Sequence, residues 1–265
     1  MDFSCAIFGP RGDLVANAPR KNRSNSNLQG TTLTSADVPV HLGSMAYAVK
    51  YQHELYGSTL KPGDVLVSNH PIAGGTHLPD ITVITPVFDT ATNDLIFYTA
   101  SRGHHRDIGG FQGISGNANA TELYQEGASI VSFKLVSDGH FDEEGIRKIL
   151  VDEPAQHPNC VGTSSLYDNL SDLRAQVAAN AKGSALIQGL FEEYGREVVQ
   201  VNINILIHSK DETNQYLVLH GPHTRERRDR SAEILEKDFR EAQRPRFERD
   251  RQSRQRNPDQ TRDSY

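Results

Sequence analysis

Two segments rich in histidine and aspartate flank one apolar hairpin, and this feature constrains the fold of the chain more than any other. Residues 81–88 are β-branched and apolar, as a buried strand requires, and residues 95–100 have the composition of its returning partner. Residues 89–94, Asp-Thr-Ala-Thr-Asn-Asp, have turn chemistry. The pattern therefore predicts an antiparallel hairpin over residues 81–100.

Strand pairing in this hairpin brings the two polar segments together. If Phe88 pairs with Leu95, Asp80 lies opposite Gly103. The side chains that can then converge at the open end of the hairpin are His77, Asp80, His104, His105 and Asp107. Imidazole and carboxylate together suit a divalent metal such as Mn²⁺, Fe²⁺ or Zn²⁺. A hydrogen-bonded structural role for these histidines is the alternative, because the chain lacks a regular four-ligand spacing.

Length and composition place the chain among soluble globular proteins. Its 265 residues suffice for one large or two small domains, and 36% of them are hydrophobic. No apolar run approaches the roughly 20 residues that a membrane helix needs, and no secretory signal is visible. Two cysteines are too few for a disulfide scaffold. We therefore expect a cytoplasmic protein with free thiols and no membrane partner.

Charge is spread unevenly along the chain. Residues 222–265 carry a net charge of +3 and the remainder carries −9, so the body of the protein is acidic. An acidic body argues against nucleic acid as the main partner. Residues 20–37 lack apolar periodicity, and we expect a disordered insertion there, with a basic docking loop as the alternative. Residues 202–265 are expected to form an atypical charged tail that is partly disordered.

The remaining pattern predicts an α+β fold, with a mixed or antiparallel sheet and flanking helices. Residues 3–8 and 13–16 predict a second hairpin, whose first strand we expect at an edge of the sheet. Gly183 is the expected break in the last helix. The apolar periodicity predicts helices over residues 44–55, 142–150 and 168–201.

Three stretches carry a resemblance to a known family. They are Asn-His-Pro-Ile-Ala-Gly-Gly-Thr-His-Leu-Pro-Asp at 69–80, Arg-Gly-His-His-Arg-Asp-Ile-Gly-Gly at 102–110, and Val-Pro-Val-His-Leu-Gly-Ser-Met at 38–45. Over residues 2–19 and 38–201 the chain resembles the hydantoinase B family, and within it the second half of eukaryotic-type ATP-dependent 5-oxoprolinases. His70 points to the 5-oxoprolinase branch, because many bacterial relatives have aspartate there. The resemblance implies a truncated hydantoinase B-like domain over residues 1–201.

The function implied by the resemblance is ATP-driven opening of the 5-oxoproline ring, or of a hydantoin-type ring. In such enzymes a hydantoinase A half binds ATP and phosphorylates the cyclic amide, and the hydantoinase B half acts on the activated product. This chain has no Gly-x-x-x-x-Gly-Lys phosphate loop. We therefore expect it to need a hydantoinase A-like partner that uses the ATP. Assembly of the chain into a homo-oligomer stays open as well.

The resemblance also implies roles for individual residues. The implied metal ligands are His77, Asp80 and His104, and the ion is Mn²⁺, Zn²⁺ or Mg²⁺. The expected catalytic residues are His105 and Asp107, as a base or as orienters behind the metal ligands, and Glu126, for which a solvated loop glutamate is the alternative. The implied substrate-binding residues are His41, Asn69, His70 and Arg102. Two other interpretations stay open: a non-catalytic remnant or interaction module from a truncated gene product, and a ketone carboxylase-like subunit.

Overall fold

The computed structural model describes residues 3–17, 39–111 and 120–205. The expected insertion at 20–37 and the tail from residue 206 onward lie outside the described residues. The chain divides into two compact units, residues 1–196 and residues 197–265. The first unit contains the sheet and its helices, and in the second unit residues 197–205 are helical. Within the described residues, no helix has the length and apolar character needed to cross a membrane.

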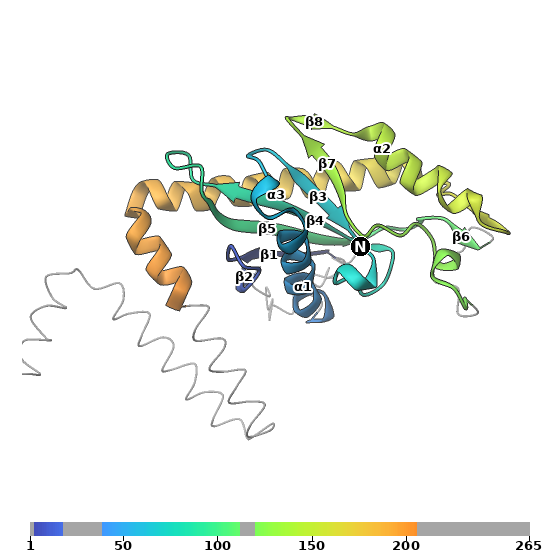
Figure 1. Ribbon diagram of the computed structural model, residues 1–265, viewed down its shortest axis with the longest axis horizontal. Coiled ribbons are helices and arrows are strands. Elements are labelled where there is room, and N and C mark those ends of the chain that lie inside the picture. The colour runs from blue at the N-terminus through green and yellow to red at the C-terminus, as the bar shows by residue number, and fades with distance from the viewer. Residues whose placement is uncertain (1–2, 18–38, 112–119, 206–265) are drawn as a thin grey trace, which may run out of the picture. The chain divides into compact units, whose positions relative to one another are not determined.

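A seven-stranded sheet forms the centre of the first unit, in the order β2-β1-β5-β4-β3-β7-β8 (Figure 1). Its strands are β1 (Phe3–Phe8), β2 (Leu14–Asn17), β3 (Val65–Ser68), β4 (Asp80–Phe88), β5 (Leu95–His104), β7 (Phe133–Ser137) and β8 (His140–Phe141). Two short strands, β6 (Gly110–Phe111) and β9 (Cys160–Val161), pair separately. All neighbouring strands are antiparallel, which confirms the expected α+β class.

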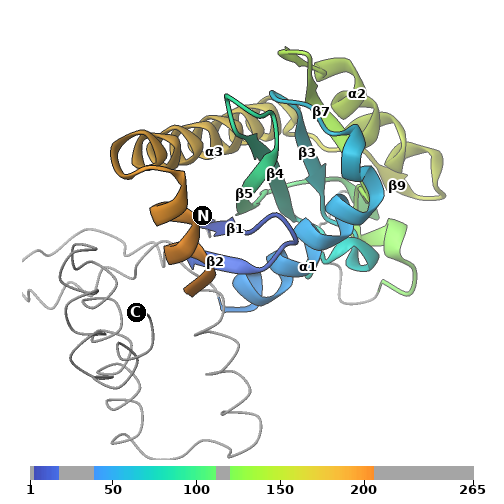
Figure 2. The same cartoon turned by 60° about the vertical axis from the view of Figure 1, so that its left-hand side comes forward.

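Helices pack on both faces of this sheet. The helices are α1 (Pro39–Tyr56), α2 (Glu143–Arg147) and α3 (Leu166–Tyr194), and α2 continues as a π-helical turn over Lys148–Asp152. Figure 2 shows α1 and α3 on opposite sides of the central strands. Because side chains alternate along a strand, β5 directs Tyr98 and Arg102 toward α1 and directs Thr99 and His105 toward α3.

The core follows the same alternation. On the α1 face, Leu66 and Ile84 pack with Met45 of the helix. On the other face, Val67 and Val83 pack in a cluster that reaches α2 and α3. The two apolar layers pack β3, β4 and β5 between the helices, and the open end of the β4–β5 hairpin extends from this buried centre.

Two expectations about the fold are wrong. Strand β1 is not an edge strand, because it pairs with β2 on one side and with β5 on the other. Helix α3 runs unbroken through Gly183 and ends before Gly195, whose φ is +81°. A side chain at Gly183 would meet Thr99 of β5 at 3.6 Å, so the helix lies close to the sheet there. Packing against the sheet thus offsets the low helix propensity of glycine.

Candidate functional site

The β4–β5 hairpin brings its two His/Asp segments side by side at the open end. Phe88 pairs with Leu95 as expected, but a β-bulge follows, and every later pair is shifted by one residue. Asp80 therefore lies opposite His104, and the expectation that it would face Gly103 is wrong. Ile96 is the extra residue on β5. Because directly opposite residues share a face, the bulge places the Asp80 carboxylate beside the His104 ring.

Asp80 and three histidines, His41, His77 and His104, form a cluster. Asp80 Oδ1 lies 2.8 Å from His104 Nδ1, and Asp80 Oδ2 lies 3.1 Å from His41 Nε2. The His77 ring stacks on the His104 ring, with centroids 5.4 Å apart and planes inclined by 20°. One ligand atom from each of His77, Asp80 and His104 falls within 4.8 Å of the other two. The structure thus brings together the three residues expected to bind metal.

Exposure increases from the floor of this cluster to its rim. The side chains of His41, Asp80 and His104 are 4%, 9% and 41% exposed, and His77 is exposed as well. The carboxylate is therefore shielded from water, which strengthens its attraction for a cation. The rings of His77 and His104 remain within reach of solvent and of a ligand.

The donor atoms fit a divalent metal ion. Two imidazoles and one carboxylate form the ligand set of many zinc hydrolases and of non-haem iron sites. The 2.8 Å between Asp80 Oδ1 and His104 Nδ1 is a hydrogen-bond distance, and a bound ion would replace that hydrogen bond.

Arg102 is fully buried beneath the loop that carries His77. Burial lowers the pKa of its guanidinium to about 10, and the nearby charge of Asp80 opposes that effect. The guanidinium donates hydrogen bonds to Thr82 Oγ1, the Gly74 carbonyl, Ser44 Oγ and Thr76 Oγ1. Arg102 therefore ties the loop before β4 to helix α1 and to the sheet. Its expected contact with substrate stays a prediction.

Asn69 and His70 organise the start of the same loop. The buried Asn69 side chain donates to the Leu78 and Ala128 carbonyls and accepts from the Ile130 amide, at 2.6 to 2.9 Å. His70 caps the 3-10 turn Pro71–Ala73, where its Nδ1 accepts a hydrogen bond from the Ile72 amide at 3.0 Å. Both side chains shape the backbone that carries His77, and their contact with substrate stays a prediction.

His105 lies on the face of β5 opposite to His104. Its Nδ1 is 3.2 Å from the Asn169 amide nitrogen, and its Nε2 is 3.3 Å from Gln176 Oε1. Burial lowers the pKa of the His105 imidazole, although Gln176 and Asp172 oppose this effect. The ring is thus held against α3 between Asn169 and Gln176. The structure does not bring this expected catalytic residue to the cluster.

Asp107 and Glu126 also lie apart from the cluster. The Asp107 carboxylate accepts from the Gly109 amide and from the amide and hydroxyl of Ser164, each at 2.8 Å. Partial burial acts to raise the pKa of Asp107, but these hydrogen bonds outweigh it and lower the pKa. Glu126 ends the 3-10 turn Leu123–Glu126. In the described part of the chain, no hydrogen bond or ion pair joins either carboxylate to the cluster.

The low pKa of Asp107 predicts a pH-dependent stability. Its carboxylate stabilises the fold above its ordinary pKa of 3.8, and this stabilisation is lost as the pH falls through the lower value of the folded state. We expect Asp107→Asn to lower the melting temperature at pH 7 and to have a smaller effect at pH 3. Melting curves followed by circular dichroism measure both differences. Asp138→Asn, in an exposed turn, is the control, and equal effects of Asp107→Asn at both pH values would contradict the assignment.

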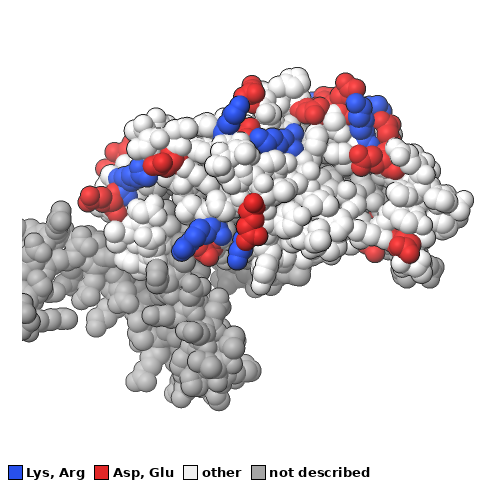
Figure 3. Space-filling view, in the orientation of Figure 1, with Lys and Arg blue, Asp and Glu red and all other residues white. Residues whose placement is uncertain are grey.

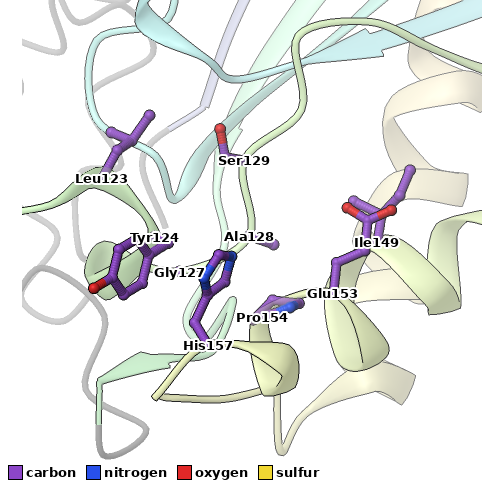
Figure 4. A pocket seen from close by; sticks show the side chains of 9 residues that line it. All are labelled: Leu123, Tyr124, Gly127, Ala128, Ser129, Ile149, Glu153, Pro154 and His157. Atoms are coloured by element: carbon purple, nitrogen blue, oxygen red, sulfur yellow. The ribbon is translucent and has the colours of Figure 1, made fainter. Parts of the chain in front are cut away.

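A pocket of about 270 Å³ lies beside the 3-10 turn that ends at Glu126 (Figure 4). Tyr124 and His157 stack at one side of it, with ring centroids 4.3 Å apart, and Ile149 and Glu153 line the other. None of the expected site residues lines this pocket. On the face seen in Figure 3, basic and acidic side chains of the described residues are interspersed, so charge does not single out a ligand-binding region there.

Ser4 also contacts the cluster, through His41, although no sequence pattern indicated a role for it. Its hydroxyl lies 3.2 Å from His41 Nδ1. The contact exists because β1 pairs with β5, which places Ser4 opposite Arg102 on the α1 face of the sheet. The pairing joins segments almost 100 residues apart, and no local signal predicts it.

Comparison with known proteins identifies the family. The family model described as Hydantoinase B/oxoprolinase matches residues 1–218. The chain belongs to the hydantoinase B/oxoprolinase family. The 5-oxoprolinase of Saccharomyces cerevisiae is 52% identical to it over 194 residues, which are 73% of this chain and 14% of that protein. 5-oxoprolinase 1 of Arabidopsis thaliana is 48% identical over 202 residues, which are 76% of this chain and again 14% of that protein. This hydantoinase B chain therefore spans about one seventh of these relatives.

Two solved structures share the fold of this chain. The ATP-dependent caprolactamase from Pseudomonas jessenii superimposes with a TM-score of 0.65 and 27% identity, over 84% of this hydantoinase B chain and 34% of that chain. An acetone carboxylase in its nucleotide-free form gives a TM-score of 0.61 over 78% of this chain and 24% of that chain. Its 17% identity shows a shared fold alone.

Proposed function

We propose that this hydantoinase B chain supplies the hydrolytic, metal-dependent site of an ATP-driven enzyme that opens a cyclic amide. The observation that carries the proposal is the cluster of His77, Asp80 and His104 at the open end of the β4–β5 hairpin. The proposed substrate is 5-oxoproline, or a hydantoin-type ring, phosphorylated on its amide oxygen, and the product from 5-oxoproline is glutamate. The identity of the chain to 5-oxoprolinases supports this choice.

The chemistry explains why such a site needs an activated substrate. An unstrained lactam resists water, and phosphorylation of its oxygen makes the amide carbon more electrophilic. Water then attacks this carbon, the C–N bond breaks, and both protons of the water are transferred to the nitrogen, which becomes an amine. The resulting acyl phosphate reacts with a second water and yields a carboxylate and phosphate.

In this proposal the cluster positions the attacking water. A divalent ion held by His77, Asp80 and His104 would lower the pKa of that water. The exposed ring of His77 and the partly exposed ring of His104 face the solvent side, from which the substrate arrives, and the Asp80 carboxylate lies on the shielded side. His105 and Asp107 act on the site indirectly in this scheme. His105 fixes the end of β5 against α3, and Asp107 holds the segment at Ser164.

The ATP step is assigned to a partner. The chain lacks a phosphate-binding loop, and its matches cover only 14% of the 5-oxoprolinases. The beta subunit of the Pseudomonas jessenii caprolactamase is 33% identical over 174 residues, which are 66% of this chain and 28% of that subunit. A beta subunit works beside another subunit, and we propose a hydantoinase A-like, ATP-binding half as the partner here.

Complementation tests this function. The purified chain is mixed with the ATP-binding half of a 5-oxoprolinase, ATP, Mn²⁺ and 5-oxoproline, and the release of glutamate is measured. We expect release that stops on chelation and falls at least about 100-fold in the variant His77→Ala/His104→Ala. Equal rates with parent and variant would reject the site. A folded, metal-loaded parent that releases no glutamate would instead favour a non-catalytic interaction module.

A further inference from the structure

We propose that His41 and Ser4 form a positioning pair that holds the Asp80 carboxylate in its metal-binding orientation. The inference rests on the proposed metal-binding role of the cluster. His41 is 3% exposed and Ser4 is 1% exposed, so neither side chain lies open to a substrate. The family resemblance implied that His41 binds substrate, and its burial favours a role that acts through Asp80.

A continuous line of contacts connects the pair to the cluster. Ser4 Oγ lies 3.2 Å from His41 Nδ1, His41 Nε2 lies 3.1 Å from Asp80 Oδ2, and Asp80 Oδ1 lies 2.8 Å from His104 Nδ1. The four side chains come from β1, α1, β4 and β5. Each position is thus fixed by a different element packed into the core, which suits a rigid support for a metal ligand.

The chemistry of the carboxylate sets the direction of these hydrogen bonds. An ionised carboxylate only accepts, so His41 Nε2 carries the hydrogen and donates it to Asp80. In the neutral ring Nδ1 is then an acceptor, and the Ser4 hydroxyl donates to it. The Asp80 carboxylate thus sets the tautomer of His41, and the Ser4 hydroxyl supports it from the other side of the ring. With Oδ2 engaged in this way, Oδ1 is left facing His104 and the metal position.

A serine hydrolase triad has the same three residue types but does not explain this arrangement. In that triad the histidine Nε2 faces the serine and Nδ1–H faces the aspartate. Here the two ring nitrogens are exchanged, with Nδ1 toward Ser4 and Nε2 toward Asp80. The burial of Ser4 also keeps its hydroxyl away from any substrate carbonyl. The pair is better suited to orienting a ligand than to nucleophilic attack.

Mn²⁺ binding by the metal-free chain tests the proposal, with the free ion measured by electron paramagnetic resonance. Partners behind metal ligands typically contribute 10- to 100-fold to affinity, so we expect His41→Leu to weaken Mn²⁺ binding by about that factor. His41→Gln, whose amide N–H can replace that of the ring, should restore most of the affinity. The matched control is His53→Leu, on the same helix, where His53 Nδ1 lies 2.9 Å from the Tyr98 hydroxyl. It should bind Mn²⁺ like the parent.

The outcomes separate this inference from the function on which it rests. Equal affinities in the parent and in folded His41→Leu overturn the positioning role and leave the metal site standing, whereas a parent without Mn²⁺ binding overturns both. A second measurement uses nitrogen-15 spectra of the histidine rings in the metal-free chain. The proposal predicts a hydrogen on His41 Nε2, and a ring protonated only at Nδ1 overturns it, even where His41→Leu fails to fold.

Discussion

Replacing Gly75 with alanine is expected to destabilise the fold by about 4 kcal/mol or more, which is exceptional for one methyl group. A Cβ atom at this position would lie 1.7 Å from the Asn69 carbonyl oxygen and 2.8 Å from the His70 carbonyl carbon. Both obstacles are backbone atoms. The Asn69 side chain is itself fixed by three hydrogen bonds, so this backbone cannot move aside without breaking them.

Thermal unfolding measures this effect. For a domain of this size, 4 kcal/mol lowers the melting temperature by about 10 °C. Gly43→Ala is the control, because Gly43 lies within helix α1 with no atom within 4 Å of its added Cβ. There alanine should stabilise the helix by about 1 kcal/mol. If Gly75→Ala melted at the parent temperature, the tight loop that presents His77 would not exist as described.

Local sequence patterns predicted the central hairpin, but they could not predict pairing between strands that lie far apart in the sequence. The hairpin over residues 81–100 could be read from the sequence because its strands and its turn are contiguous. The partner of β1 could not, since its pairing with β5 joins residues such as Phe3 and Gly103. The sequence alone therefore does not reveal that β1 is an interior strand or that Ser4 lies beside His41.

The β-bulge at Ile96 determines which histidine lies beside Asp80. Without it, Asp80 would face Gly103, and His105 would share the face of the carboxylate, because side chains alternate along the strand. The observed register places His104 on that face and turns His105 toward α3. The insertion of one residue depends on packing around the strand, so the expected strand pairing indicated five candidate side chains, and resemblance to relatives was needed to single out His77, Asp80 and His104.

The largest effect on function is expected from removing both rim histidines. In His77→Ala/His104→Ala only Asp80 remains of the three proposed metal ligands, and one carboxylate does not hold a borderline divalent ion tightly. Both rings lie at the rim of the cluster, so their removal should leave the apolar core packed, although the hydrogen bond between His104 and Asp80 is lost. We therefore expect loss of metal without loss of fold.

The metal content of the chain tests the central claim most directly. Three proteins are compared: the parent, the variant His77→Ala/His104→Ala, and a control in which two exposed histidines are replaced, His140→Ala/His157→Ala. Each protein is loaded with Mn²⁺ or Zn²⁺ and freed of excess ion by gel filtration, and its metal content is measured by mass spectrometry. The account predicts close to one ion per chain in the parent and the control, and almost none in the folded His77/His104 variant. Equal metal in all three proteins, or a well-folded parent without metal, would contradict it.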